Sequence, residues 1–428
     1  MINKEMVKRY IVNFHQKDFS NIKKRELKIE KIKDKAISIV GPRRVGKTYL
    51  LFSLMDNPEN YIYIDFENPV FYNSTPEDII FILEAYKELY PGKKPIVFLD
   101  EVQNVKDWER MVRYLLDENI ETFVTGSSSK LLSKEIATQL RGRSITYYLF
   151  TLSFREFLEF KDIKYKGKEF YENYEKIKKL IREYLYYGAY PEVVINEQKE
   201  RILNEYLELI IKKDILERYK IKNINLVNEL IYFSINNYSR YISYDSLFKL
   251  LKQKINVTKK TIIDYLSYFE DALLFFLVRK YYPSVKQRII SPRKIYLIDT
   301  GYGIFGEKSI SKDMENIVFL ELLRNKYYRS ILQEIYYFQT KEGYEIDFLI
   351  KEGNKIAKLI NVSYVNNFDE IDKREIRSLI HSYELFKEHN PELIIITWDY
   401  EDEKEISWFN KKGKIKFIPL WKWLLNIQ

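Results

Sequence analysis

The stretch ISIVGPRRVGKTYLL, residues 37–51, decides the fold of the amino-terminal part of the chain. An apolar run of strand length enters it and an apolar helical run leaves it, so two glycines, a lysine and a threonine lie at a strand-to-helix turn. Residues 41–48, GPRRVGKT, match GxxxxGKT in every specified position. Glycines let backbone N–H groups surround phosphate, and the helix that follows offers its positive end. The stretch therefore predicts a nucleotide-binding loop, and the alternative is an ordinary glycine-rich turn.

A second motif, IVFLDEVQ at residues 96–103, is an apolar strand that ends in two carboxylates. Lys47 of the loop is expected to reach the terminal phosphates and Thr48 to ligate Mg²⁺. Asp100 would then support the Mg²⁺ shell, and Glu101 would polarise a water for attack on the γ-phosphate. The alternative is a solvated acidic pair at a strand end. The predicted nucleotide-binding residues of the loop are Gly41, Pro42, Arg43, Arg44, Val45, Gly46, Lys47, Thr48 and Tyr49.

Further strands indicate which class of phosphate-loop protein this is. The strand YIYIDF at 61–66 lies between the two motifs, which favours the additional-strand, catalytic-glutamate class and hence hydrolysis. The next strand, 122–127, ends in small hydroxyl residues, so Ser127 or Ser128 is expected to sense the γ-phosphate or, alternatively, to cap a helix. Beyond it, Arg141 and Arg143 are either fingers that complete a neighbour's site, with Arg143 preferred, or surface salt-bridge partners.

Composition limits the other possibilities. The 428 residues are 46% hydrophobic and contain no cysteine and only three histidines, so disulfides and cysteine metal sites are excluded and any divalent metal is expected to be oxygen-bound. The amino terminus lacks an apolar signal segment, and no apolar run approaches the length of a membrane span. We therefore expect a cytoplasmic protein that does not bind a membrane. Residues 1–35 carry eleven Lys/Arg against five Asp/Glu, which predicts a basic arm or, alternatively, a solvated amphipathic helix.

The pattern along the chain predicts an α/β protein of several domains. Strands and helices alternate over 36–151, as in a parallel sheet covered on both faces. Helical periodicity follows over 152–222, and a helix, turn, helix and strand over 223–290 suggest a winged helix with 283–294 as its wing. That wing segment contains four basic and no acidic residues. Strands return at about 293, so residues 291–428 are expected to form a mixed sheet with a packed helix.

The motifs, in their order, resemble those of AAA+-like ATPases of archaea and bacteria, related to the STAND branch, whose carboxy-terminal domain is similar to PD-(D/E)XK nucleases. The resemblance covers nearly the whole chain. It implies ATP as the nucleotide, and it implies that Gly188 and Pro191 belong to a helical lid that contacts the nucleotide; the alternative is a loop between two helices. It rests on GPRRVGKT, FLDEVQ, TGSSS, LRGR with LSFREFL, YGAYPEVV, TIIDYLSYFEDALLF, YLIDTG, MENIVFLELL and YEIDFLI.

A nuclease of the type that this resemblance implies needs carboxylates to hold Mg²⁺ and a lysine on the adjoining strand. Glu315, or alternatively Glu321, and Asp347 fit the carboxylate positions. The strand KLINVSY, however, has Asn361 in the acidic place and Ser363 in the lysine place. Lys358 should point to the other face of the sheet, which leaves a lysine from the helix near 372–380 as an alternative. We therefore expect a degenerate nuclease-like domain, used for binding or structure.

Three functions follow from these patterns. The first is an ATP-driven switch or motor whose partner is DNA, held by Lys259 and Lys260 at the start of the second helix of the winged helix, or a protein. The second is a protein-interaction scaffold that ATP stabilises without turnover. The third is an ATP-regulated, Mg²⁺-dependent nuclease. A nucleotide-dependent oligomer is compatible with the first two.

Overall fold

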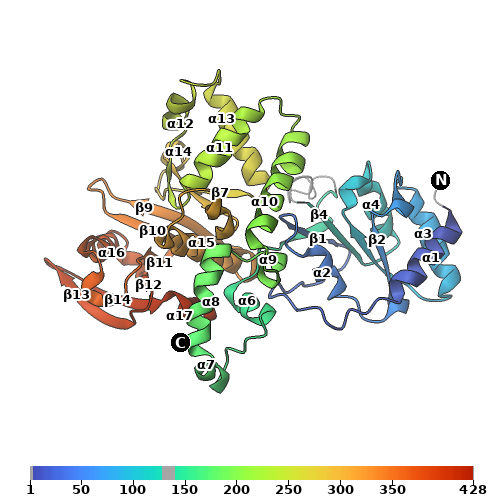
Figure 1. The fold of residues 1–428 in the computed structure, drawn as a ribbon, viewed down its shortest axis with the longest axis horizontal. Helices are drawn as coiled ribbons and strands as arrows, with labels where there is room; N and C mark the ends of the chain where they lie inside the picture. Colours follow the sequence, from blue (N-terminus) through green and yellow to red (C-terminus); the bar gives the residue numbers. More distant parts are fainter. Residues whose placement is uncertain (1–2, 128–139, 428) are drawn as a thin grey trace. The chain divides into compact units, whose positions relative to one another are not determined.

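The computed structural model describes residues 3–127 and 140–427 (Figure 1). Contacts divide the chain into two compact units, Met1–Phe150 and Thr151–Gln428. The division lies next to the boundary at 151/152 that the sequence predicts. The helical, winged-helix-like and carboxy-terminal segments, predicted as separate domains, lie together in the second unit.

A five-stranded parallel sheet forms the centre of the first unit, in the order β2-β3-β4-β1-β5. This confirms the predicted parallel α/β core. Strand β4 lies between β1, which leads into the phosphate loop, and β3, which ends at Asp100, so the sheet has an additional strand between the two motifs. The strand at 61–66, on which the sequence prediction rests, is β2 at the edge of the sheet next to β3. The elements are β1 (Ala36–Gly41), β2 (Tyr61–Asp65), β3 (Ile96–Asp100), β4 (Thr122–Ser127), β5 (Ser144–Tyr148), α1 (Lys4–His15), α2 (Lys47–Phe52), α3 (Asp78–Leu89) and α4 (Trp108–Asp117).

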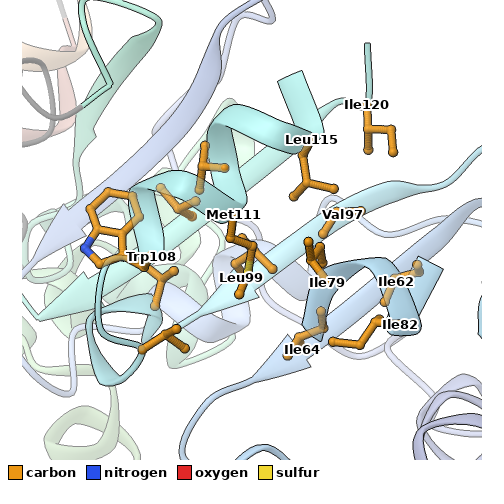
Figure 2. Close-up of a cluster of buried hydrophobic side chains, with 14 of the residues drawn as sticks. Ile62, Ile64, Ile79, Ile82, Val97, Leu99, Trp108, Met111, Leu115 and Ile120 are labelled. Atoms are coloured by element: carbon orange, nitrogen blue, oxygen red, sulfur yellow. The ribbon is translucent and has the colours of Figure 1, made fainter. Parts of the chain in front are cut away.

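Aliphatic side chains on one face of this sheet pack against α3 and α4 (Figure 2). Strands β2 and β3 alternate apolar residues toward these helices, while α4 presents apolar residues at helical spacing, with charged residues on its other side. Each fully buried side chain of this size contributes about 1.5–3 kcal/mol through removal from water. The labelled residues are Ile62, Ile64, Ile79, Ile82, Val97, Leu99, Trp108, Met111, Leu115 and Ile120.

The amino-terminal segment is not a separate basic arm. Its helix α1 buries Val7, Ile11 and Phe14 and packs against α3 and β2 within the first unit. Lys4 and Lys8 form ion pairs with Glu88 of α3, at 2.5 and 2.7 Å. The amphipathic helix, which was the alternative, is therefore what forms, and acidic residues of α3 engage part of its positive charge.

The second unit begins with a group of helices. A capping box at Ser153 and Glu156 starts the first of them, because each side chain accepts a hydrogen bond from the other residue's backbone N–H. A π-helical segment, Ile210–Glu217, continues the last helix of the group. The helices are α6 (Phe154–Phe160), α7 (Lys168–Glu172), α8 (Tyr174–Tyr187), α9 (Pro191–Ile195) and α10 (Lys199–Leu209).

A three-stranded antiparallel sheet in the order β6-β8-β7 follows, with helices before and between its strands. Thr258 caps α13, since its Oγ1 accepts from the Thr261 N–H at 3.1 Å. The winged-helix assignment itself stays a prediction. The elements are α11 (Ile224–Asn236), β6 (Arg240–Ile242), α12 (Tyr244–Leu251), α13 (Lys259–Asp271), β7 (Phe275–Arg279), α14 (Val285–Ile290) and β8 (Arg293–Leu297).

Two sequence predictions about this region need correction. Strand β8 pairs with β6 and β7, so the predicted boundary at 290/291 separates it from its own sheet. The predicted wing, 283–294, forms the short helix α14 and the first two residues of β8. Its basic residues are mostly used inside the unit: Arg288 donates to Tyr336 Oη at 3.2 Å, and Arg293 and Lys294 are buried. Of the four, Lys286 remains exposed to solvent.

The carboxy-terminal part contains the mixed six-stranded sheet that the sequence predicts, in the order β13-β14-β12-β11-β10-β9. Strands β11, β12 and β14 are parallel to one another, while β9, β10 and β13 pair antiparallel with their neighbours. Throughout residues 3–127 and 140–427, no helix has the length and apolar character to cross a membrane. The elements are α15 (Ile310–Tyr328), β9 (Gln333–Gln339), β10 (Glu345–Glu352), β11 (Lys355–Val362), α16 (Lys373–Leu385), β12 (Glu392–Thr397), β13 (Asp402–Trp408), β14 (Lys411–Pro419) and α17 (Leu420–Leu425).

Candidate functional site

The predicted phosphate loop connects the end of β1 to the start of α2. Gly46 caps the helix with φ +96°, a left-handed conformation that glycine adopts without strain. At Gly41 a Cβ atom would lie 2.3 Å from the carbonyl oxygen of Leu149, so a larger residue would push the loop off β5. The Lys47 ammonium donates to the carbonyl oxygens of Gly41 and Pro42, at 3.0 and 3.1 Å. The loop therefore curls around its own lysine, at the amino end of a helix.

Arg25, in the segment before β1, forms hydrogen bonds that connect the phosphate loop to the rest of the first unit. Its guanidinium donates to the carbonyl oxygens of Val45, at 2.9 Å, and of Phe150, at 2.7 Å. One side chain thus joins the loop to the end of the first unit. Sequence reasoning missed this contact, because nothing in a single basic residue of a basic segment indicates a carbonyl partner.

Asp100 is held by two hydroxyl groups at the carboxyl end of β3. Thr125 of β4 donates to one carboxylate oxygen, and Tyr63 of β2 donates to the other at 2.7 Å. The Asp100 side chain is buried, and the Glu101 N–H donates to Thr125 Oγ1 at 3.2 Å. Charge-assisted hydrogen bonds of this kind fix the orientation of a carboxylate. Neither Tyr63 nor Thr125 is predicted from the sequence as part of the site, since Tyr63 lies in the middle of β2 and Thr125 lies within β4.

Glu101 follows in a left-handed conformation with φ +50°, which turns it away from the line of the strand, and its carboxylate accepts from Gln103 Nε2. Asp65 and Glu67 lie at the end of the neighbouring strand, with Asp65 in register with Asp100. Burial, together with the negative charges of Asp100 and Glu101, raises the pKa of Asp65, and burial and Glu101 likewise raise the pKa of Glu67. The strand ends therefore form a strongly negative region that favours a cation.

The spacing of these elements fits a metal-bound nucleotide. Since β4 separates β1 from β3, the loop and Asp100 lie about 10 Å apart across two strand spacings, room enough for a phosphate and its cation. Within the described part of the chain, no group of three or more Asp, Glu, His or Cys side chains is arranged to hold a metal ion by itself. Mg²⁺ bound to a nucleotide takes most of its oxygens from phosphate and water, so Thr48 and Asp100 would be sufficient protein partners.

Four further predicted residues lie at different places. Ser127 ends β4 in register with Gly41, and Ser128 lies outside the described residues. Arg143 precedes β5, where its carbonyl accepts from the N–H of Ala36, the first residue of β1. Arg143 therefore lies at the amino-terminal ends of the strands, whereas the phosphate loop of the same chain lies at their carboxyl ends. The length of β1, about 16 Å, separates the two. Its guanidinium forms an ion pair with Asp117 at 2.6 Å. A role for Arg143 or the exposed Arg141 at a neighbour's site stays a prediction.

The predicted lid residues lie in the second unit. Gly188 ends α8 and Pro191 begins α9. Asp299 packs directly on Gly188 and accepts a hydrogen bond from the Ala189 N–H at 2.8 Å, so a structural reason for this glycine is present. Contact of Pro191 with a nucleotide stays a prediction.

The predicted nuclease remnant forms a second cluster of charged residues. Glu315, on α15, and Asp347, on β10, converge on the ammonium of Lys294, on β8, each at 2.8 Å. Asn361, on β11, accepts from the Asp347 N–H at 3.2 Å, and its amide donates to Glu375. Ser363 lies beyond the end of β11, where its N–H donates to the carbonyl of Ile396.

Other predictions for this cluster are corrected or extended. Glu321 is not part of it, because it forms buried ion pairs with Arg155, at 2.6 Å, and Arg324, at 3.2 Å. Lys358 pairs with Glu392 at 3.5 Å. The helix near 372–380, expected as an alternative source of a lysine, supplies a carboxylate, Glu375. The lysine comes instead from β8, which no feature of the sequence places beside β10.

Comparison with known proteins identifies three matching domain families. They are an AAA domain over residues 33–158, a domain of unknown function (DUF8612) over residues 178–304 and a domain of unknown function (DUF4143) over residues 312–422. The AAA match includes the loop and both carboxylates at the end of β3, so residues 33–158 are an AAA domain of the P-loop class.

Similar whole proteins are known. "Uncharacterized protein MJ1544" of Methanocaldococcus jannaschii is 36% identical over 412 residues, which are 94% of this chain and 91% of that protein. An uncharacterized protein of Haemophilus influenzae is 28% identical over 445 residues, covering 100% of this chain and 99% of that protein. Among solved structures, a Walker-type ATPase of Pyrococcus abyssi aligns with 71% of this chain and 95% of its own, with a TM-score of 0.39 and 15% identity.

Proposed function

Since the chain belongs to the family of the Methanocaldococcus jannaschii protein MJ1544 and has an AAA domain at residues 33–158, we propose that it is an ATP-hydrolysing switch or motor. One observation carries the proposal. Lys47, at the start of α2, and Asp100 and Glu101, at the end of β3, lie at the same edge of a parallel sheet, with β4 between their strands. This arrangement supports phosphate binding and water activation next to each other.

Each side chain then has a separate task. The Lys47 ammonium exchanges the carbonyl oxygens of Gly41 and Pro42 for phosphate oxygens, and the N–H groups of the loop and of α2 bind the same phosphates. Thr48 and Asp100 would hold Mg²⁺, which would supply positive charge to neutralise the transferred phosphoryl group. Glu101 accepts hydrogen bonds from the attacking water and orients it. Tyr63 and Thr125 keep the Asp100 carboxylate in place.

Replacement of Lys47 by alanine is expected to weaken ATP binding about tenfold or more, because the charge-assisted hydrogen bonds of one ammonium are worth about 1.5–3 kcal/mol. Titration with a fluorescent ATP analogue would measure this. Lys35→Ala is a control, since Lys35 donates to the Gly142 carbonyl away from the loop and its loss should leave ATP affinity unchanged. Equal affinities of the wild type and Lys47→Ala would contradict the proposed site. Tight binding with no turnover in the wild type would favour an ATP-stabilised scaffold instead.

A specific surface favours DNA as the partner of the switch. Around the turn between α12 and α13, the side chains of Lys249, Lys252, Lys254 and Lys260 are exposed, and we call them the lysine face. Lys259, predicted as a DNA contact, forms an ion pair with Asp245 at 2.6 Å. Because α1 and α14 use much of their basic charge inside the protein, the lysine face is where we propose that phosphate backbones bind.

Glutamine at all four positions of the lysine face is expected to reduce affinity for duplex DNA about tenfold or more at moderate salt. It should also lower the slope of log K against log salt by about 2–4, since each phosphate contact contributes about 0.9. Fluorescence anisotropy with a labelled duplex over a salt series measures both. Glutamine at four exposed lysines elsewhere, Lys176, Lys179, Lys212 and Lys412, makes the same change in net charge and should have a smaller effect. Equal losses in the two variants would mean that only overall charge matters.

A further inference from the structure

Lys294 is a buried cation among carboxylates. Its side chain is 3% exposed, and its Nζ lies 2.8 Å from Glu315, 2.8 Å from Asp347 and 3.0 Å from Glu345. The three acids come from two elements, α15 and β10, whereas Lys294 belongs to β8 of the three-stranded sheet. The Lys294 ammonium thus contacts acids that lie 21 to 53 residues later in the sequence.

The acids are oriented by bonds other than those to the lysine. Tyr296 donates to Glu315 at 2.6 Å, and the second oxygen of Asp347 accepts from the Val362 N–H at 3.0 Å. Asp347 and Glu345 are two residues apart on one strand and so share a face of the sheet. The carboxylates therefore point at a common centre because the backbone and neighbouring side chains hold them there.

The charge of the cluster is unbalanced. Burial disfavours the charged form of Lys294, but Asp347 and Glu315 outweigh this effect and raise the pKa of the ammonium well above its ordinary value. Burial raises the pKa of Glu315 to about 7, and burial together with Asp347 raises that of Glu375 to about 8. One ammonium thus faces three carboxylates, so the cluster holds more acidic groups than basic ones. Converging carboxylates with excess negative charge are what a divalent cation requires.

We propose that the ammonium of Lys294 is the resident cation of this carboxylate site, that it occupies the place a divalent metal would otherwise take, and that it thereby fastens the three-stranded sheet to the carboxy-terminal sheet. An ammonium at 2.8–3.0 Å from three carboxylates fills the centre on which a cation with oxygen ligands at about 2.1–2.5 Å would have to sit. With Lys294 in place, the described residues contain no group of three or more Asp, Glu, His or Cys side chains arranged to hold a metal ion. The inference does not depend on ATP hydrolysis.

Contacts near Lys294 show that it lies where the three-stranded sheet packs against the carboxy-terminal sheet. The Tyr281 N–H, just after β7, donates to the carbonyl of Tyr337 in β9 at 2.7 Å, and Arg288 of α14 donates to Tyr336 Oη. The Tyr241 ring of β6 faces the Lys294 ammonium at 5.5 Å. A buried ion cluster in the middle of such a junction makes separation of the two sheets unfavourable, since parting them would leave the charges unpaired.

Removal of the lysine should turn the cluster into a metal site. Lys294→Ala is expected to lower the melting temperature, and millimolar Mn²⁺ without nucleotide should then raise it by about 5 °C in a saturable way. Wild-type protein should show no such shift, and neither should Lys294→Ala combined with Asp347→Asn. Lys358→Ala removes a lysine that is 43% exposed, lies on β11 in the sheet that contains Asp347, and pairs with Glu392, so it is the matched control and should behave as the wild type.

Two results would overturn the proposal. One is a Mn²⁺ shift in the wild type that Asp347→Asn abolishes, because the metal would then bind beside the lysine. The other is a Lys294→Ala protein that melts as the wild type does and ignores Mn²⁺. Should Lys294→Ala fail to fold, Mn²⁺ titration of the wild type and of Asp347→Asn by calorimetry still decides: Asp347-dependent binding refutes the proposal, and its absence supports it.

Discussion

Glu101→Gln is expected to reduce ATP turnover about 100- to 1,000-fold, the contribution of a well-placed general base. Glutamine has the same shape and still accepts a hydrogen bond from Gln103, but its amide cannot take a proton from the attacking water. The left-handed backbone at residue 101, φ +50°, should be retained, because the side chain beyond Cβ does not set it. Nucleotide affinity should therefore stay within a few-fold of the wild type.

The measurement is a steady-state ATPase assay beside a binding titration, so that turnover and affinity are separated. Glu67→Gln is the matched control: it removes a nearby carboxylate whose pKa is raised by burial and by Glu101, at the end of the neighbouring strand. We expect it to change turnover by less than about threefold, because only a group in contact with the water can act as its base. If Glu67→Gln abolished turnover and Glu101→Gln did not, the base would be Glu67.

The phosphate loop and the parallel sheet could be predicted because each depends on residues that are close together in the sequence. The loop of residues 41–48 is contiguous, and the strand before it and the helix after it are short apolar runs, so its place at a strand-to-helix turn could be predicted from the sequence. The same is true of the parallel sheet, because strands buried on both faces are apolar throughout. Residues that act through distant partners were missed: Tyr63 and Thr125 hold Asp100 from other strands.

The errors have the same physical origin. The sequence of an apolar strand does not specify which strands it pairs with. The sequence therefore assigns β8 to the carboxy-terminal domain, although β8 pairs with β6 and β7. The basic residues at 1–35 and 283–294 predict a basic arm and a basic wing, yet Lys4 and Lys8 form ion pairs with Glu88, and Lys294 is buried among acids. The charged residues of a segment predict the net charge of a surface only when the residues that form ion pairs with them in the folded protein are known.

Gly188→Ala is expected to destabilise the second unit by about 3–5 kcal/mol. The backbone at Gly188 has φ +73° and ψ −156°, a region that is essentially restricted to glycine, and strain there contributes about 1–3 kcal/mol. In addition, a Cβ would lie 1.5 Å from Oδ1 of Asp299 and 2.8 Å from the Gly301 N–H. Asp299 cannot retreat, because it is buried and its two oxygens accept from the Ala189 and Gly301 N–H groups, at 2.8 and 2.9 Å.

Urea unfolding followed by tyrosine and tryptophan fluorescence would measure this loss, and a second glycine separates its two causes. Gly353 has φ +57°, and no heavy atom lies within 4 Å of the position that an alanine methyl group would take there. Gly353→Ala should therefore show backbone strain alone, about 1–2 kcal/mol. In an Asp299→Ala background, Gly188→Ala should cost less than in the wild type, because the carboxylate is gone, but more than Gly353→Ala, because the Gly301 backbone nitrogen still lies 2.8 Å from the Cβ position. Equal costs of the two glycine substitutions in the wild-type background would instead show that the Asp299 contact is not tight. Packing against Asp299 would then not explain why Gly188 is a glycine. That result would favour the predicted contact of the loop containing Gly188 and Pro191 with the nucleotide.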